Sequence, residues 1–364
     1  MSTQKIKVGI LFGGKSAEHE VSLQSAKNVA EAIDKDKYEV SLIGIDKSGQ
    51  WLLPNQSQYL LNASDPKRIQ LNHEERESVA LVPESGGALS DLTSGGTHSS
   101  IRVVFPILHG PFGEDGTVQG LLKLAGVPFV GAGVLGSSVG MDKDVMKRLL
   151  RDAGLPIGKF VVLRRNDLLD FETVAAEIGL PCFIKPANLG SSVGVHKVTD
   201  KASFEDACAD AFSFDSKILA EEFIDGRELE CAVLGNENPE ASVVGEIVPS
   251  HEFYSYDAKY IDEQGAALVI PADVPEAVSE EIRSLAIRTF QTLECEGLGR
   301  VDCFLKKDGT VVVNEINTIP GFTKISMYPQ LWEASGLPYG DLINRLIELA
   351  IERFEREEKL KTSV

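Results

Sequence analysis

The sequence predicts an α/β protein whose first domain is built around a parallel sheet. The chain begins with an apolar run at 7–12, a helical apolar spacing at 21–33 and a second apolar run at 40–45. A strand–helix–strand unit of this kind pairs its strands in parallel. The chain has 364 residues, of which 43% are hydrophobic and 25% charged. That is ordinary globular composition, and the length corresponds to two or three domains.

Charge and cysteine content narrow the class of protein. Lys and Arg number 36 against 55 Asp and Glu, a net charge of −19, which excludes nucleic-acid binding by general electrostatics. No apolar run approaches the roughly 20 residues of a membrane helix, and the N-terminus is a poor signal peptide. We therefore expect a cytoplasmic enzyme with reduced, mostly buried thiols. The cysteines are odd in number and lack C-x-x-C spacing: Cys182, Cys208, Cys231, Cys295 and Cys303.

The remaining elements follow in order along the chain. Residues 84–100 are rich in Gly and Ser and are interpreted as an exposed loop within an insertion of the first domain. The helix at 341–354 has one apolar stripe, and such stripe helices suggest a homodimer. The other predicted elements are strands at 103–108, 128–130, 182–185, 193–198, 218–223, 228–234, 300–305 and 311–316, and helices at 118–125, 142–153, 204–212 and 275–293.

Two glycine motifs resemble nucleotide-binding fingerprints in the wrong context. Gly9–Ser16 matches the P-loop pattern, but its x residues are the strand itself. Gly131–Gly136 matches G-x-G-x-x-G, yet no acidic strand end follows about 20 residues later. A nicotinamide-dependent dehydrogenase remains an alternative on this motif. The plainer interpretation is a crossing between domains where glycine permits the turn.

The strongest chemical signal is a predicted hairpin near the C-terminus. The Asp-Gly pair at 308–309 lies between two β-rich runs and indicates a two-residue turn. That turn pairs Lys307 with Thr310, so Asp302 lies directly opposite Glu315. Directly opposed residues share a face, and two opposed carboxylates repel each other. Something must therefore compensate this charge.

A bound cation or Arg300 is the candidate for that compensation. Asn317 lies opposite Arg300 and shares the face with Asp302 and Glu315. Two carboxylates and an amide carbonyl form an oxygen-only set, which suits Mg²⁺ completed by phosphate and water. A solvated face or an ion-pair network is the alternative. The opposite face is predicted to be core: Val301, Cys303, Leu305, Val312 and Ile316.

Two further segments suit a nucleotide. Lys185 ends a strand and precedes a loop of Gly and Ser at 186–192, whose backbone N–H groups could cover phosphate oxygens. Residues 220–228 place acidic side chains around a short apolar strand end, where a purine and a ribose could bind. Taken singly, each could also be an ordinary hairpin or a charged exposed turn.

The order of these pieces resembles the ATP-grasp superfamily, and more closely the D-alanine–D-alanine ligase family. Residues 8–22 (VGILFGGKSAEHEVS) resemble its N-terminal signature, and 109–116 (HGPFGEDG) resemble its second. The hairpin with 317–323 (NTIPGFT) resembles its C-terminal signature. The likeness runs from about residue 5 to about 355, and the segment 51–100 fits the longer variants of the family.

The resemblance implies a three-domain ATP-grasp fold with an N-terminal Rossmann-like parallel sheet domain. The implied domains are residues 1–131, 132–221 and 222–364, with ATP between the central and C-terminal domains. It also implies ATP-dependent ligation of two D-alanine molecules through a D-alanyl phosphate, for peptidoglycan precursors. The implied cofactors are ATP and two Mg²⁺ or Mn²⁺. Another ATP-grasp carboxylate–amine ligase and a silent nucleotide-binding module are the alternatives.

The resemblance also implies a role for each matching residue. Glu18 would hold the ammonium of the first D-alanine. Its position also suggests an active-site residue independently of the resemblance, because it lies between a strand end and a helix start. Residues 251–265 (HEFYSYDAKYIDEQG) are expected to form a lid over ATP, and Tyr260 resembles the dipeptide-forming branch. The implied roles are catalysis by Glu18, Ser191, Tyr260, Arg300, Gly321 and Ser326; substrate binding by His109 and Met327; nucleotide binding by Lys143, Lys185, Glu221, Glu222, Phe223, Ile224, Glu228, Phe253 and Lys259; and metal binding by Asp302, Glu315 and Asn317.

Overall fold

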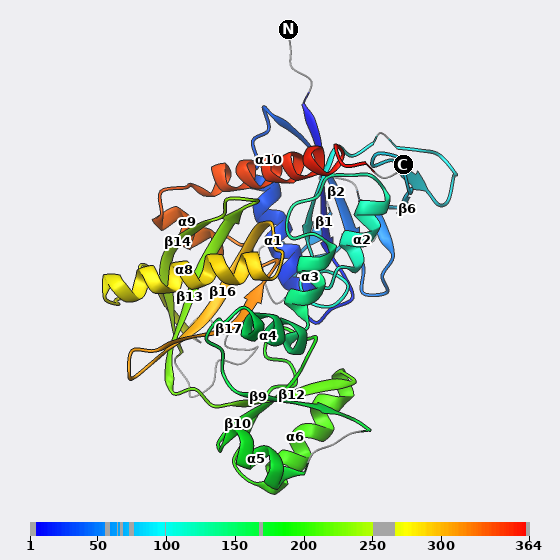
Figure 1. The fold of residues 1–364 in the computed structure, drawn as a ribbon. Helices are drawn as coiled ribbons and strands as arrows, with labels where there is room; N and C mark the ends of the chain where they lie inside the picture. Colours follow the sequence, from blue (N-terminus) through cyan, green and yellow to red (C-terminus); the bar gives the residue numbers. More distant parts are fainter. Residues whose placement is uncertain are drawn as a thin grey trace.

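The architecture comes from a computed structural model (Figure 1). In the described part of the chain the strands form three larger sheets, on which the helices pack, and one two-stranded ladder. The structure describes residues 5–54, 59–63, 65, 68–72, 76–98, 100–166, 170–249 and 266–361. Within these ranges no helix is both long enough and apolar enough to cross a membrane.

The first sheet has six strands in the order β7-β6-β3-β2-β1-β8. As predicted, β1 and β2 pair in parallel around α1 (His19–Ala32), and β8 pairs in parallel with β1. The edge β3-β6-β7 is antiparallel. The strands are β1 (Ile6–Gly13), β2 (Tyr38–Ile45), β3 (Trp51–Pro54), β6 (Arg76–Leu81), β7 (Leu89–Asp91) and β8 (Val103–Ile107), and β4 (Leu60–Leu61) with β5 (Gln70–Leu71) forms a separate two-stranded ladder.

The expectation that residues 84–100 form an exposed loop is wrong in part. Leu89–Asp91 is the edge strand β7, and the Leu89 side chain is buried. The Gly/Ser-rich composition hid a three-residue strand, which pairs with β6 on one side and with residues 96–98 of the same segment on the other. The P-loop interpretation of Gly9–Ser16 is excluded as expected, since its first residues lie inside β1.

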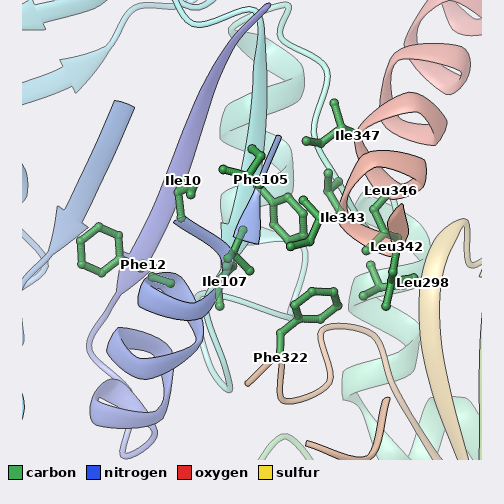
Figure 2. Close-up of a cluster of buried hydrophobic side chains, with 14 of the residues drawn as sticks. Ile10, Phe12, Phe105, Ile107, Leu298, Phe322, Leu342, Ile343, Leu346 and Ile347 are labelled. Atoms are coloured by element: carbon green, nitrogen blue, oxygen red, sulfur yellow. The ribbon is translucent and has the colours of Figure 1, made fainter. Parts of the chain in front are cut away.

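The first sheet shares its core with the C-terminal helix α10 (Tyr339–Glu357). Figure 2 shows Ile10, Phe105 and Ile107 facing Ile343 and Leu346, with Phe322 beneath them. The predicted apolar stripe of this helix is therefore covered by the chain's own sheet. It offers no ground for the expected homodimer, which stays a prediction.

The central sheet is antiparallel, with the order β11-β10-β12-β9. Its own apolar cluster forms with two helices, one of them the predicted helix at 204–212 extended at both ends. The elements are β9 (Phe160–Arg164), α5 (Phe171–Ile178), β10 (Cys182–Pro186), β11 (His196–Val198), α6 (Lys201–Phe214) and β12 (Lys217–Glu222).

The third sheet is also antiparallel, with the order β15-β14-β13-β16-β17. Apolar residues of α8 pack against one face, and those of α9 pack against the other. The elements are β13 (Gly226–Gly235), β14 (Glu240–Pro249), β15 (Ala266–Val269), α8 (Glu276–Thr292), β16 (Gly297–Lys306), β17 (Val311–Asn317) and α9 (Met327–Ala334).

Three helices connect the first sheet to the others: α2 (Thr117–Leu124), α3 (Val134–Met141) and α4 (Lys143–Asp152). Gly131 precedes α3 with a φ of +98°, so the G-x-G-x-x-G segment includes a turn that glycine permits. Met146 and Leu150 of α4 pack in the apolar cluster of α8 and the third sheet. The domain division at 131 and 221 stays a prediction.

The hairpin β16–β17 corrects the predicted turn. The Lys306 N–H donates to Thr310 O at 2.9 Å, so the loop has three residues, and Gly309 adopts a φ of +86°. This shifts the pairing by one residue, so Val313 lies opposite Cys303 and packs in the core, where the predicted pairing placed Asn314. An extra residue at Asn314 then shifts it back.

Because the two shifts cancel, the predicted pairing of the functional residues is confirmed. Asp302 lies opposite Glu315, and Arg300 lies opposite Asn317. The expectation of unpaired thiols also agrees with the structure, since all five cysteines are free and buried.

Candidate active site

A cavity of about 470 Å³ lies between the central sheet and the third sheet. Its size falls within the range of small-molecule sites. Its walls come from helix α4, the β10–β11 loop, the β12–β13 connection, strand β14 and the hairpin β16–β17. Residues far apart in the chain therefore meet where the sequence predicted a nucleotide.

Buried lysines give this cavity its positive end. Lys185 Nζ lies 2.7 Å from Glu221 Oε2, and Lys147 Nζ lies 3.5 Å from Glu221 Oε1. Lys143 Nζ donates to Leu189 O at 2.6 Å and lies 3.6 Å from a Glu315 carboxylate oxygen. Three ammonium groups thus face two carboxylates, and the surplus charge suits a polyphosphate.

The pKa values at this end follow from burial and pairing. Burial alone would raise the pKa of Glu221, but the charges of Lys147 and Lys185 outweigh it and lower that pKa. Burial lowers the pKa of Lys147 despite the attraction of Glu221. For Lys185 burial acts in the same direction, yet Glu221 and Glu315 raise its pKa overall. Glu221 is therefore a buried carboxylate held ionised by the surrounding lysines, chiefly Lys147 and Lys185.

The Gly/Ser loop closes one side of the cavity. Ser191 and Ser192 have φ values of +53° and +58°, and Gly194 has +68°. Such left-handed residues in series form the concave backbone that binds anions through N–H groups. The loop follows β10, so it begins beside Lys185 as the sequence predicted.

The β12–β13 connection, where the sequence predicted a purine and a ribose, lines one part of the cavity. Phe223, Ile224 and Glu228 line it as expected. Glu222 also lines it, but its Oε1 accepts a hydrogen bond from the Lys159 N–H at 2.9 Å. That carboxylate therefore holds the chain before β9. Phe253, Lys259, Tyr260 and the expected lid at 251–265 lie outside the described residues.

The carboxylates of the hairpin are compensated by cations of the chain itself. Arg300 donates from Nε and a terminal nitrogen to the two oxygens of Asp302, at 2.7 and 2.8 Å. Arg300 Nε also lies 2.9 Å from buried Glu230. Asn317 Nδ2 donates to Asp302 Oδ2 at 3.0 Å. Of Arg300 and a bound cation, the two groups predicted to offset the charge of the paired carboxylates, Arg300 pairs with Asp302 in the structure.

The donor set fits Mg²⁺ in part. Within the described residues no cluster of three or more His, Cys, Asp or Glu side chains is placed to hold a metal. Asp302, Glu315 and the Asn317 carbonyl instead offer a few oxygen ligands on one face of the hairpin. Mg²⁺ is usually bound by one or two carboxylates together with waters and substrate phosphates. The residues therefore suit a metal that arrives with a nucleotide.

A second polar corner lies beside the N-terminal strand. Buried Glu18 precedes α1 and accepts a hydrogen bond from Ser191, as the resemblance implied. His109 Nδ1 lies 2.9 Å from Ile319 O, so Nδ1 carries a proton. Burial lowers the pKa of His109, which keeps the ring neutral. This corner therefore joins the N-terminal strand end, the Gly/Ser loop and the segment after the hairpin.

Ser326 and Met327 lie at the start of α9, close to Gly321. Ser326 Oγ accepts from the Thr323 N–H at 3.1 Å, and an added Cβ on Gly321 would lie 3.2 Å from that oxygen. The Met327 side chain packs in the core against Gly245 of β14. Only the main chain of Met327 is therefore placed to meet a ligand.

Three residues of the site were missed by sequence reasoning. Lys147 lies one helical turn after Lys143, and this i, i+4 spacing was the signal available for it. Glu230 lies opposite Asp302 across β13 and β16, a pairing that no local motif indicates. Glu114 lies in the 109–116 motif, where it received no role.

An α/β chain with a lysine-lined nucleotide cavity between two antiparallel sheets, closed by a carboxylate-bearing hairpin, has the ATP-grasp fold. Comparison with known sequences narrows this class. The family model "D-ala D-ala ligase N-terminus" matches residues 7–132, and "D-ala D-ala ligase C-terminus" matches residues 149–348. The chain belongs to the D-alanine–D-alanine ligase family.

Individual relatives cover almost the whole chain. A D-alanine–D-alanine ligase of Shouchella clausii is 58% identical over 363 residues, covering 99% of this chain and 98% of the relative. The solved D-alanine–D-alanine ligase of Coxiella burnetii is 38% identical with a TM-score of 0.86, over 98% and 97% of the two chains. The VanG D-Ala:D-Ser ligase of Enterococcus faecalis is 35% identical with a TM-score of 0.82, over 95% and 100%.

Proposed function

We propose that this protein joins two D-alanine molecules to D-alanyl-D-alanine, with conversion of ATP to ADP and phosphate, for peptidoglycan precursor synthesis. The observation that carries the proposal is the junction of the lysine-lined cavity with the Glu18–Ser191 corner and the hairpin carboxylates. Membership of the D-alanine–D-alanine ligase family supports the same reaction. The first D-alanine carboxylate attacks the γ-phosphate, and the amine of the second attacks the resulting acyl phosphate.

The nucleotide binds along the cavity. Lys143 and Lys185 hold the α- and β-phosphates, and Lys259 holds the terminal phosphates. Their ammonium groups neutralise charge while the phosphoryl group moves, which is the main requirement of phosphoryl transfer. The adenine and ribose lie against the β12–β13 connection, contacting Glu221, Glu222, Phe223, Ile224, Glu228 and Phe253.

The hairpin face binds the divalent ions. Asp302, Glu315 and Asn317 hold two Mg²⁺ or Mn²⁺, which when bound neutralise the phosphate oxygens and orient them. In the structure, Arg300 contacts the Asp302 carboxylate and Lys143 contacts the Glu315 carboxylate. We propose that Lys143 turns from Glu315 to phosphate as the nucleotide enters.

The first D-alanine binds in the Glu18 corner. Glu18 pairs with its ammonium, and His109 contacts it from the neighbouring loop. Arg300 and the Gly321 N–H face the oxyanion that forms during amide synthesis, where preorganised donors act most strongly. The hydroxyls of Ser191 and Tyr260 hold Glu18 in place. The second D-alanine places its carboxylate at Ser326 and the Met327 N–H, where the start of α9 favours an anion.

Three broader features belong to the same proposal. The chain is divided into domains 1–131, 132–221 and 222–364, with ATP between the second and third. Residues 251–265 close over ATP and exclude water. The protein works in the cytoplasm as a homodimer.

The experiment that tests the function is release of phosphate from ATP and Mg²⁺ with D-alanine, L-alanine or no amino acid. Release should require D-alanine, and D-alanyl-D-alanine should be formed. Asp302→Ala should lose about 100-fold or more of this activity, the scale of removing a principal electrostatic group. Asp206→Ala, an exposed change on α6, is the matched control and should retain the wild-type rate.

Other outcomes distinguish the alternatives. Release with another carboxylate and amine, such as D-serine as second substrate, would keep the ATP site but replace the substrate. Release that needs neither alanine would contradict the assignment of D-alanine. Loss of function in Asp206→Ala equal to that in Asp302→Ala would remove the case for the hairpin.

A further inference from the structure

The loop at 109–116 holds the main chain of one residue, Ile319, in the segment that follows β17. The Glu114 carboxylate accepts from the Ile319 N–H at 3.0 Å through Oε1, and from the Gly110 N–H at 2.7 Å through Oε2. His109 Nδ1 donates to the carbonyl of the same Ile319 at 2.9 Å. Both polar atoms of Ile319 are thus bonded to side chains of a loop more than 200 residues away in sequence.

The segment is held again three residues later. Phe322 is buried, its N–H faces Ser25 Oγ at 3.4 Å, and its carbonyl accepts from the Tyr339 hydroxyl at 2.7 Å. Its ring packs between Phe105 and Tyr339. Ile319 and Phe322 are therefore both anchored, and the short stretch between them has little freedom.

Gly321 lies within this anchored stretch. Among the described residues, its N–H donates no hydrogen bond to the protein. A main-chain donor that is held on both sides and left without a protein acceptor is the arrangement expected of a preorganised oxyanion donor. Such a donor needs neighbours that keep it in place before substrate arrives.

We infer that Glu114 is a positioning residue for this donor: with His109 it clamps the main chain of Ile319, and Tyr339 completes the clamp from the C-terminal helix. The inference rests on the proposed function, because it assigns the Gly321 N–H to the oxyanion of the acyl transfer. Glu114 itself touches only the two main-chain N–H groups, so it acts through the segment it holds.

The clamp needs two acceptor oxygens at position 114. Both oxygens of Glu114 are acceptors, and each faces an N–H donor. A glutamine has one acceptor oxygen and one NH₂ donor, so one of the two N–H groups must lose its partner.

Gly110 leaves no room for a side chain in this loop. Its φ is +75°, and an added Cβ would lie 2.9 Å from Glu18 Oε2. The loop therefore packs directly against the corner that would hold the first D-alanine.

The first test compares the ligation kinetics of Glu114→Gln and wild type. A displaced oxyanion donor should lower kcat by about 10- to 100-fold, below the loss for removing such a donor outright. The KM for ATP should stay within about twofold, because none of the three clamp residues, Glu114, His109 and Tyr339, lines the nucleotide cavity. Tyr339→Phe removes only the Phe322 anchor and should lower kcat by a smaller factor. A kcat within twofold of wild type in both variants would overturn the inference.

Matched controls separate the clamp from general effects of each substitution. Glu172→Gln changes an exposed side chain at the start of α5, and Tyr38→Phe changes a buried tyrosine of β2. Both should keep the wild-type kcat. A rise in the KM for D-alanine alone in Glu114→Gln, with kcat unchanged, would make Glu114 a substrate contact and overturn the positioning role.

Hydrogen exchange tests the clamp without any substrate. Amides in a peptide spanning 317–325 should exchange faster in Glu114→Gln than in wild type, while those of β13 stay unchanged. Unchanged exchange in 317–325 would overturn the clamp even if activity fell. If wild type made no dipeptide from D-alanine but this exchange difference appeared, the proposed function would fail while the clamp stood.

Discussion

At the scale of single residues, the site depends on ionisable groups held away from their usual pKa values. Glu114 is the clearest case. Its burial and the charge of Glu18 raise its pKa to about 8, although two N–H groups favour the ionised form. The pKa of the neighbouring His109 is lowered, because burial disfavours the charged imidazolium.

The raised pKa of Glu114 gives a pH dependence of stability. An acid whose pKa is higher in the folded protein stabilises the fold below its ordinary pKa, and that contribution is lost as pH rises toward 8. The loss is at most about 1.4 kcal/mol per pH unit. The melting temperature of wild type relative to Glu114→Gln should therefore fall between pH 5 and pH 8 without ligands. A difference that grows with pH would contradict the shift.

At the scale of elements, helix α4 contributes positively charged side chains, Lys143 and Lys147, to the wall of the cavity. Its N-cap Asp142 accepts from the Val145 N–H at 3.0 Å and pairs with Lys217 of β12 at 2.6 Å. The helix is therefore tied to the central sheet by charge, while Met146 and Leu150 pack into the core of the third sheet. Lys143 and Lys147 extend from this doubly anchored helix.

Lys147→Met tests the contribution of α4. Lys147 is 1% exposed and supplies one of the lysine charges that hold Glu221 ionised. Its removal lowers the positive charge around the phosphates, so the KM for ATP should rise by about tenfold or more, equivalent to about 1.4 kcal/mol. Arg151→Met, one turn further along on an exposed side chain, should leave it unchanged. An unchanged KM for ATP in Lys147→Met would contradict this role.

The hairpin shows how an element can be predicted correctly for an incomplete reason. The Asp-Gly pair indicated a two-residue turn, whereas the chain forms a three-residue turn and a bulge at Asn314. The bulge restores the opposition of Asp302 and Glu315. Local turn chemistry could not reveal it, because a bulge depends on how both strands fit the whole sheet.

At the scale of the whole molecule, the chain is closed on itself by a core that its two ends share. Leu346 of α10 is fully buried in the cluster that contains Ile10 and Phe105 of the first sheet. Arg353 of the same helix stacks on Phe129, with 4.4 Å between its guanidinium and the ring centroid, and donates to Phe129 O at 2.8 Å. The first sheet and the C-terminal helix should therefore lose their structure together.

Leu346→Ala tests this shared core. Truncating a fully buried leucine leaves a cavity and should cost about 2–5 kcal/mol of stability. Amide exchange should then quicken in β1 and β8 as well as in α10, while α6 of the central sheet stays unchanged. Leu360→Ala, which removes an exposed side chain, is the matched control. Faster exchange confined to α10 would contradict a shared core.

The sequence by itself determined the class of fold and the parallel strand pair at the N-terminus. It also determined which face of the hairpin carries the carboxylates, and the strand ending near Lys185 before the Gly/Ser loop. These features are local, since they depend on apolar period, turn residues and motif spacing within a few dozen residues. Only the tertiary structure decided that Glu114 meets Ile319, that Glu230 pairs with Arg300 and that the last helix covers the first sheet. Each joins segments 70 or more residues apart, and such contacts follow from packing, which no local pattern encodes.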